Sequence, residues 1–213
     1  MIPLRDVIPS RTTPYITVTI IVLNALAWLF ELSLTHEELN EFITYYGVIP
    51  AYVTFPTLIT SMFLHGGWLH VIGNMWSLWI FGDNVEDRMG SWRFLFFYLA
   101  SGFVAAILHS ALMPGSPIPT VGASGAIAGV LGAYALAFPR AKVLTLIPIF
   151  FFFQVVAVPA LVVLGIWFVF QFIAGTLSLG GGSGGVAWWA HSAGFAFGFI
   201  VMGLMTRRQR LAE

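Results

Sequence analysis

Residues 122–129 read GASGAIAG, and residues 190–198 read AHSAGFAFG. The first stretch opens an apolar run and the second lies inside one, and they place Ser124 and His191 at the depth expected for a lipid bilayer. Polar side chains at that depth are costly unless they have a partner or a function. The small residues around them let helix backbones approach closely. We therefore expect a nucleophile and its base to meet inside a membrane.

The composition is that of an integral membrane protein. Of the 213 residues, 59% are hydrophobic and only 8% are charged, whereas a soluble domain carries about 25% charged residues. The chain has no cysteine, which excludes disulfides, thiolate metal sites and cysteine nucleophiles. Residues 1–14 are polar and precede an apolar run that is long enough to span, so no cleavable signal peptide is expected.

Six spans are expected, because a spanning helix needs about 20 apolar residues and prolines and glycines mark the ends of the apolar runs. The run at 143–179 is too long for one straight helix, and Pro148 and Pro159 divide it. Residues 143–153 are therefore expected as an apolar stretch near the interface. The expected spans are residues 15–34, 57–81, 92–112, 123–138, about 156–177 and 186–205.

This pattern predicts an all-α polytopic membrane protein with a single domain over residues 1–213. A segment at 1–14 precedes the six-helix core at 15–206, and a tail at 207–213 follows it. With six spans, every basic residue falls on one side of the membrane, so the positive-inside rule places both termini in the cytoplasm. Five or seven spans would break this segregation. The basic residues are Arg5, Arg11, Arg88, Arg93, Arg140, Lys142, Arg207, Arg208 and Arg210.

Four polar side chains are expected at similar depth. Ser124 and His191 each lie 16 residues before a basic residue at the cytoplasmic end of the span. At 1.5 Å per residue this places both roughly 24 Å above that end, within a hydrocarbon core about 30 Å thick. His70 lies roughly 20 Å up by the same rise, and Asn74 faces the same way at i+4.

These residues fit nucleophilic catalysis. A serine hydroxyl is a weak nucleophile until an adjacent base takes its proton, and His191 can play that part. No Asp or Glu is expected at this depth, so the pair would be a dyad without the carboxylate of a triad. The oxyanion would need donors, and His70, the Asn74 amide and the backbone N–H of Ser124 are the candidates.

Three motifs resemble those of the rhomboid family of intramembrane serine proteases. Their order, spacing and six-span layout agree with the family, so the resemblance covers nearly the whole chain. It implies cleavage of single-pass membrane proteins at or near the outer end of their transmembrane helix, with Ser124 as nucleophile and His191 as base. It also implies that His70, Asn74 and Gly122 form the oxyanion and substrate-binding group. The motifs are His70-x-x-x-Asn74, Gly122-x-Ser124-Gly125 and Ala190-His191-x-x-Gly194-x-x-x-Gly198, and residues 85–90 also resemble a family loop.

The sequence departs from the family pattern in two places. Some bacterial members carry a Trp-Arg pair in the first outer loop, and residues 34–57 contain neither residue. Some members place a Tyr one turn after the serine, stacked on the histidine, where this chain has Ala128. The orientation of the His191 ring must therefore come from other residues.

Hydrolysis needs water, which the bilayer core lacks, so the site must open to the outside. Residues 180–185 read GGGSGG, which predicts a flexible linker between the fifth and sixth spans. We expect the fifth span and this linker to form a mobile gate for a substrate helix. Trp167, Phe170 and Gln171 would face that entrance.

Other interpretations remain open. A non-catalytic rhomboid-like protein that binds client transmembrane helices should lack the Ser or the His, and a transporter or channel usually shows repeats or a charged pathway. Ser124 alone could be a small packing residue, and His70 and Asn74 could only tie helices together. No His-Glu-x-x-His metal motif occurs.

We expect transmembrane substrates and membrane lipids as partners, a prokaryotic plasma membrane as the location, and no cofactor, metal or nucleic acid.

Overall fold

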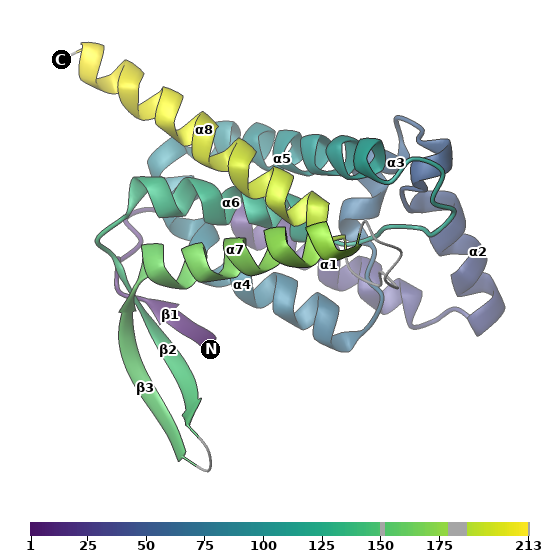
Figure 1. The fold of residues 1–213 in the computed structure, drawn as a ribbon, viewed down its shortest axis with the longest axis horizontal. Coiled ribbons are helices and arrows are strands. Elements are labelled where there is room, and N and C mark those ends of the chain that lie inside the picture. The colour runs from purple at the N-terminus through teal and green to yellow at the C-terminus, as the bar shows by residue number, and fades with distance from the viewer. Residues whose placement is uncertain (150–151, 179–186, 213) are drawn as a thin grey trace.

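The computed structural model is a bundle of helices, and a small sheet extends from one end of it (Figure 1). The structure describes residues 1–149, 152–178 and 187–212. Within these ranges α6 lies in the middle of the bundle and contacts α4, α5, α7 and α8. The long helices are α1 (Tyr15–Glu31), α4 (Trp68–Met89), α5 (Ser91–Leu112), α6 (Ser124–Ala137), α7 (Ala160–Ser178) and α8 (Trp188–Ala212).

Three helices in the described part of the chain are long and apolar enough to cross a membrane: Ser91–Leu112, Ala160–Leu177 and Trp188–Arg207. The apolar helices α1 and α6 are shorter, with 17 and 14 residues. Helix α4 carries charged side chains in its last two turns, which lowers its hydropathy. The count of six spans and the cytoplasmic termini therefore stay predictions.

The second expected span, residues 57–81, is not one helix. A short helix α3 (Thr57–Thr60) and a 3-10 turn η2 (Ser61–Phe63) precede α4, which begins only after Gly66 and Gly67. Glycine lowers helix stability because the unfolded chain loses more conformational freedom there. Residues 85–89, expected in a loop, form the last turn of α4, and the helix ends at Gly90 with a φ of +82°. That left-handed conformation is typical of a glycine after a helix.

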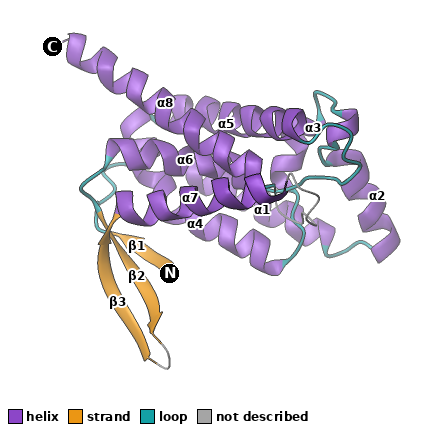
Figure 2. Cartoon of the chain, in the orientation of Figure 1, coloured by secondary structure: helices purple, strands orange, loops and turns teal. Residues whose placement is uncertain are grey.

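The expectation of an all-α chain is wrong, because three segments form an antiparallel sheet in the order β1-β2-β3 (Figure 2). Residues 143–153, expected as an apolar stretch near the interface, lie mostly in this hairpin. The β-branched residues of β2 and β3 favour strands, and a proline cannot continue a helix interior. Helix α7, which corresponds to the fifth expected span, consequently begins at Ala160 instead of near residue 156. The strands are β1 (Ile2–Asp6), β2 (Lys142–Ile149) and β3 (Phe152–Pro159).

Glycines bring α6 and α8 into close contact. A side-chain carbon on Gly194 would overlap the carbonyl oxygen of Gly125, and one on Gly198 would overlap that of Gly129. Only a residue without a side chain fits at these two crossing points. The predicted close approach of the two helices is therefore confirmed, and it places the beginnings of α6 and α8 side by side.

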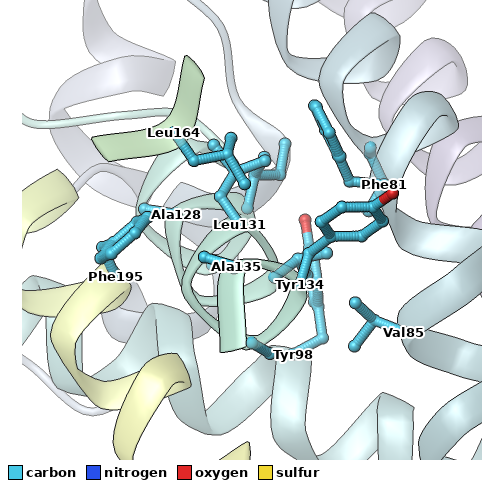
Figure 3. Packing of buried hydrophobic residues seen from close by; sticks show 14 of the residues in the cluster. Phe81, Val85, Tyr98, Ala128, Leu131, Tyr134, Ala135, Leu164 and Phe195 are labelled. Atoms are coloured by element: carbon cyan, nitrogen blue, oxygen red, sulfur yellow. The ribbon is translucent and has the colours of Figure 1, made fainter. Parts of the chain in front are cut away.

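The core of the bundle surrounds α6 (Figure 3). The Tyr134 ring packs edge-on against Phe81 of α4, with ring centroids 5.0 Å apart. The Tyr134 hydroxyl donates to a carboxylate oxygen of Asp6 at 2.6 Å, and the Asn84 side-chain amide donates to the same oxygen at 2.9 Å. These contacts tie β1 to α4 and α6, at the end of the bundle opposite Ser124.

Candidate active site

Ser124 and His191 are in direct contact. Ser124 is the first residue of α6, and His191 lies in the first turn of α8. The serine Oγ is 2.7 Å from Nε2 of the imidazole, within the hydrogen-bond reach of about 2.6–3.2 Å that a nucleophile and its base require. The structure thus brings together the two residues that the sequence singled out.

The other nitrogen of the imidazole meets an amide. Nδ1 of His191 lies 2.7 Å from Oε1 of Gln171, in the middle of α7. An amide oxygen only accepts hydrogen bonds, so Nδ1 carries the proton and donates it. In the neutral ring Nε2 is then unprotonated and free to accept the hydroxyl proton of Ser124.

Aromatic rings enclose the imidazole. The Trp167 ring lies 5.8 Å from that of His191 with 34° between the planes, and the Trp188 ring is 6.4 Å away and nearly perpendicular. Ala128 provides no ring on the α6 side. The sequence left open which residues orient the His191 ring. In the structure, Trp167 and Gln171 of α7 contact this ring.

His70 and Asn74 flank the peptide group of Gly122. Gly122 has a φ of +122°, and a side-chain carbon there would lie 2.5 Å from His70 Nε2 and 3.6 Å from Asn74 Nδ2. The backbone N–H of Gly66 donates to His70 Nδ1 at 3.3 Å. The neutral His70 ring therefore carries its proton on Nε2, which points toward Gly122 and can donate.

Asn74 has an unused donor. Its side chain is 7% exposed, and Nδ2 has no hydrogen-bond partner among the described residues. A buried donor without a partner costs about 1–3 kcal/mol, and a ligand oxygen in the site would remove that cost. The Asn74 amide, the N–H of His70 and the backbone N–H of Ser124 are therefore available to a negatively charged oxygen.

A cavity of about 880 Å³ joins these groups. Its lining includes residues from the first turns of α4, α6 and α8, and these turns lie at the end of the bundle opposite the sheet (Figure 1). The loop before Ser124 also borders it and is held in place, because Thr120 pairs with Val48 and the Gly122 N–H donates to the Ser61 carbonyl at 2.8 Å. The residues that line the cavity include His70, Asn74, Ser124, Trp167, Gln171 and His191.

The expected gate residues have different surroundings. Trp167 and Gln171 line the cavity, and Gln171 is only 5% exposed. Phe170 is 59% exposed on the outside of α7 and packs edge-on against Trp188 at 5.7 Å. The glycine-rich linker at 180–185 lies outside the described residues. The gate function of α7 stays a prediction.

Two buried polar contacts were not predicted. Both carboxylate oxygens of Glu31 accept the backbone N–H of His65 at 3.2 Å, and the His65 ring lies 5.1 Å from that of His70. The second is the contact between Gln171 and His191. The sequence signal for both contacts was a lone polar side chain in an apolar run, because such a side chain needs a partner inside the bundle. No group of three or more His, Asp or Glu that could hold a metal occurs in the described ranges.

Comparison with known protein families gives the family of the chain. The model of the rhomboid domain family matches residues 53–208. The chain belongs to the rhomboid family. The predicted family resemblance is therefore confirmed, and the apolar helices are those of an integral membrane protein.

Curated relatives occur in bacteria and in mitochondria. Rhomboid protease GluP of Bacillus subtilis is 46% identical over 76 residues, which are 36% of this chain and 14% of the relative. RHOMBOID-like protein 6, mitochondrial, of Arabidopsis thaliana is 43% identical over 76 residues, 36% of this chain and 24% of the relative. Rhomboid protein 1, mitochondrial, of Saccharomyces cerevisiae is 37% identical over 93 residues, which are 41% of this chain and 27% of the relative. The match spans less than a third of each of these relatives.

Proposed function

We propose that this rhomboid-family protein is an intramembrane serine endopeptidase that uses Ser124 and His191 as a catalytic dyad. The observation that carries the proposal is the 2.7 Å contact between Ser124 Oγ and His191 Nε2, combined with a protonated Nδ1. This arrangement leaves the base ready to accept a proton. The name of the relative GluP, a rhomboid protease, supports the same activity.

In the first half of the reaction, Ser124 Oγ attacks the scissile carbonyl carbon while His191 Nε2 takes the hydroxyl proton. The new C–O bond moves the carbonyl electron pair onto the oxygen. His70 Nε2, Asn74 Nδ2 and the Ser124 N–H donate to that oxyanion. The C–N bond then breaks as the imidazolium gives its proton to the leaving nitrogen, and an acyl-enzyme remains.

In the second half, water attacks the acyl carbon and His191 again accepts a proton. The second tetrahedral intermediate collapses, the C–O bond to Ser124 breaks, and the proton returns to Oγ. The cavity beside the dyad supplies room for this water and for the substrate backbone. No group other than side chains, backbone N–H groups and water is needed for either half.

The proposed substrates are single-pass transmembrane proteins, cut at or near the outer end of their helix. The proposal also includes six spans with both termini in the cytoplasm. The site lies where α4, α6 and α8 begin, and the sheet with the basic residues Arg5 and Lys142 lies at the other end. Basic residues favour the cytoplasmic side of a membrane, so the site would face the outside. Trp167 and Phe170 on α7 would border the path of a substrate helix from the lipid. The proposed location is the plasma membrane of a prokaryote, with lipids in contact with the exposed apolar faces.

Cleavage of a single-pass substrate in liposomes by purified protein tests this function. Wild type should cut, while Ser124→Ala and His191→Ala should not. Ser192→Ala is a matched control, because this neighbouring buried serine has no hydrogen-bond partner in the described part of the chain and no proposed role. Binding of the substrate without cleavage by wild type would instead favour a non-catalytic protein that binds client helices, and cleavage by Ser124→Ala would exclude the mechanism.

A further inference from the structure

Helix α7 is apolar almost throughout, and Gln171 is an exception in its middle. Its side chain is 5% exposed, and burying an amide without a hydrogen bond is unfavourable. The Oε1 atom finds its partner in Nδ1 of His191 at 2.7 Å. A buried glutamine on one helix and the expected catalytic base on another are thus joined by one short hydrogen bond.

This hydrogen bond selects one tautomer of His191. With Oε1 as acceptor the proton stays on Nδ1, and Nε2 can accept from Ser124. In the other tautomer Nε2 would carry the proton, and it could not act as the base. An amide achieves this selection without a charge, whereas a carboxylate at the same depth would be costly to keep in the membrane.

The same face of α7 also holds the ring by packing. Trp167 lies four residues before Gln171, which places both side chains on one face of the helix. The indole ring lies beside the imidazole at 5.8 Å, and Ala128 leaves the α6 side of the ring without an aromatic neighbour. The hydrogen bond therefore fixes the rotation of the ring, and the indole restricts its tilt.

We propose that Gln171 is a positioning residue that holds His191 in the orientation and tautomer needed for catalysis, so that the working unit extends from Ser124 through His191 to α7. This rests on the proposed protease function. It assigns a role to a residue that the sequence placed only at a gate.

The test compares the kinetics of Gln171→Leu and Gln171→Glu with those of wild type across a range of pH. Leu keeps the approximate size and removes the acceptor, so kcat should fall on the order of 10-fold to 100-fold with KM nearly unchanged, because a misplaced catalytic group lowers the rate on that scale. Glu keeps an acceptor and adds a charge that stabilises the protonated ring. It should retain more activity than Leu, and the acid limb of its pH profile should move to higher pH.

Ile173→Ala is the matched control on the same helix, because its side chain is exposed on the outer surface of α7, and it should behave as wild type. A Gln171→Leu protein with the kcat and the pH profile of wild type would overturn the proposal. A loss shared equally by Leu and Glu, with no shift in the pH profile, would make Gln171 a merely structural residue and would overturn it too.

A second readout does not depend on activity or on a known substrate. In protein labelled with ¹⁵N-histidine, wild-type His191 should show the form protonated on Nδ1, and Gln171→Leu should show a mixture of tautomers or the other form. An unchanged tautomer would overturn the proposal even if the variant folded poorly enough to lose activity. If wild type fails to cleave while the tautomer still depends on Gln171, the proposed function fails and the positioning stands.

Discussion

The indole of Trp167 lies beside the imidazole of His191, 5.8 Å between ring centroids and tilted by 34°. Aromatic contacts of this kind contribute about 0.5–1.5 kcal/mol beyond the burial of area, which corresponds to roughly 2-fold to 10-fold in rate. Trp167→Ala should therefore lower kcat by about this factor, and Trp167→Phe should retain most of the activity. Cleavage kinetics on one substrate measure both. Equal kcat values for the Ala variant and wild type would show that the ring does not need this neighbour.

Asn74 is expected to stabilise the oxyanion. Its Nδ2 donor is buried and has no partner among the described residues, and removal of one such donor typically costs 10²–10³ in kcat. Asn74→Ala should show a loss of about this size with little change in KM. Asn40→Ala, on the exposed helix α2 (His36–Tyr46), is the control and should keep the wild-type kcat. A loss confined to KM would place Asn74 in substrate binding and not at the oxyanion.

The crossing of α6 and α8 should not tolerate a side chain at Gly194. The added carbon would overlap the Gly125 carbonyl oxygen, and overpacking of this kind costs about 1–3 kcal/mol. Gly194→Ala should therefore lower both thermal stability and activity, because Ser124 and His191 move apart. Gly165→Ala on α7, where nothing lies within 4 Å of the added carbon, should change neither. Full activity in Gly194→Ala would contradict the close crossing.

The β2–β3 hairpin should lie in the headgroup region of the membrane. The side chains of Phe152 and Phe153 are 75% and 72% exposed, which favours lipid. Among the described residues no strand pairs with the outer edge of β3, and the unpaired backbone groups of that edge need water or polar headgroups. Both requirements are met at the boundary between acyl chains and water.

A spin label can measure this depth, because the chain has no cysteine of its own and single-cysteine variants are labelled at one place. A label at Phe153→Cys should report a depth between those of Val169→Cys, exposed in the middle of α7, and Glu38→Cys, exposed on α2. A fully aqueous label at Phe153 would show that the hairpin leaves the membrane.

The sequence predicts more of the candidate site than of the fold. Ser124, His191, His70 and Asn74 could be grouped because helical rise fixes depth and because glycines mark the places where helices cross. Gln171 could be recognised as a polar residue in an apolar run, but not as the partner of His191. That contact depends on how α7 is rotated against α8, which is a long-range feature of packing.

The hairpin was missed for a different reason. An apolar run such as that around Val155 and Val156 has no period that separates a strand from a buried helix. The β-branched residues were the available signal. The pairing of β2 with β3 is local, but the pairing of β2 with β1 joins residues far apart in the chain. Likewise, the break between η2 and α4 follows from Gly66 and Gly67, which hydropathy alone does not register.

The most direct test of the account asks whether Ser124 is an activated nucleophile. Wild-type protein in liposomes is treated with a fluorophosphonate that reacts with activated serines, and the modified residue is identified by mass spectrometry. The account predicts modification at Ser124 in wild type and in Ser192→Ala, and none at that position in His191→Ala. Wild-type protein that stays unmodified at Ser124, or His191→Ala protein modified as fast as wild type, would contradict it.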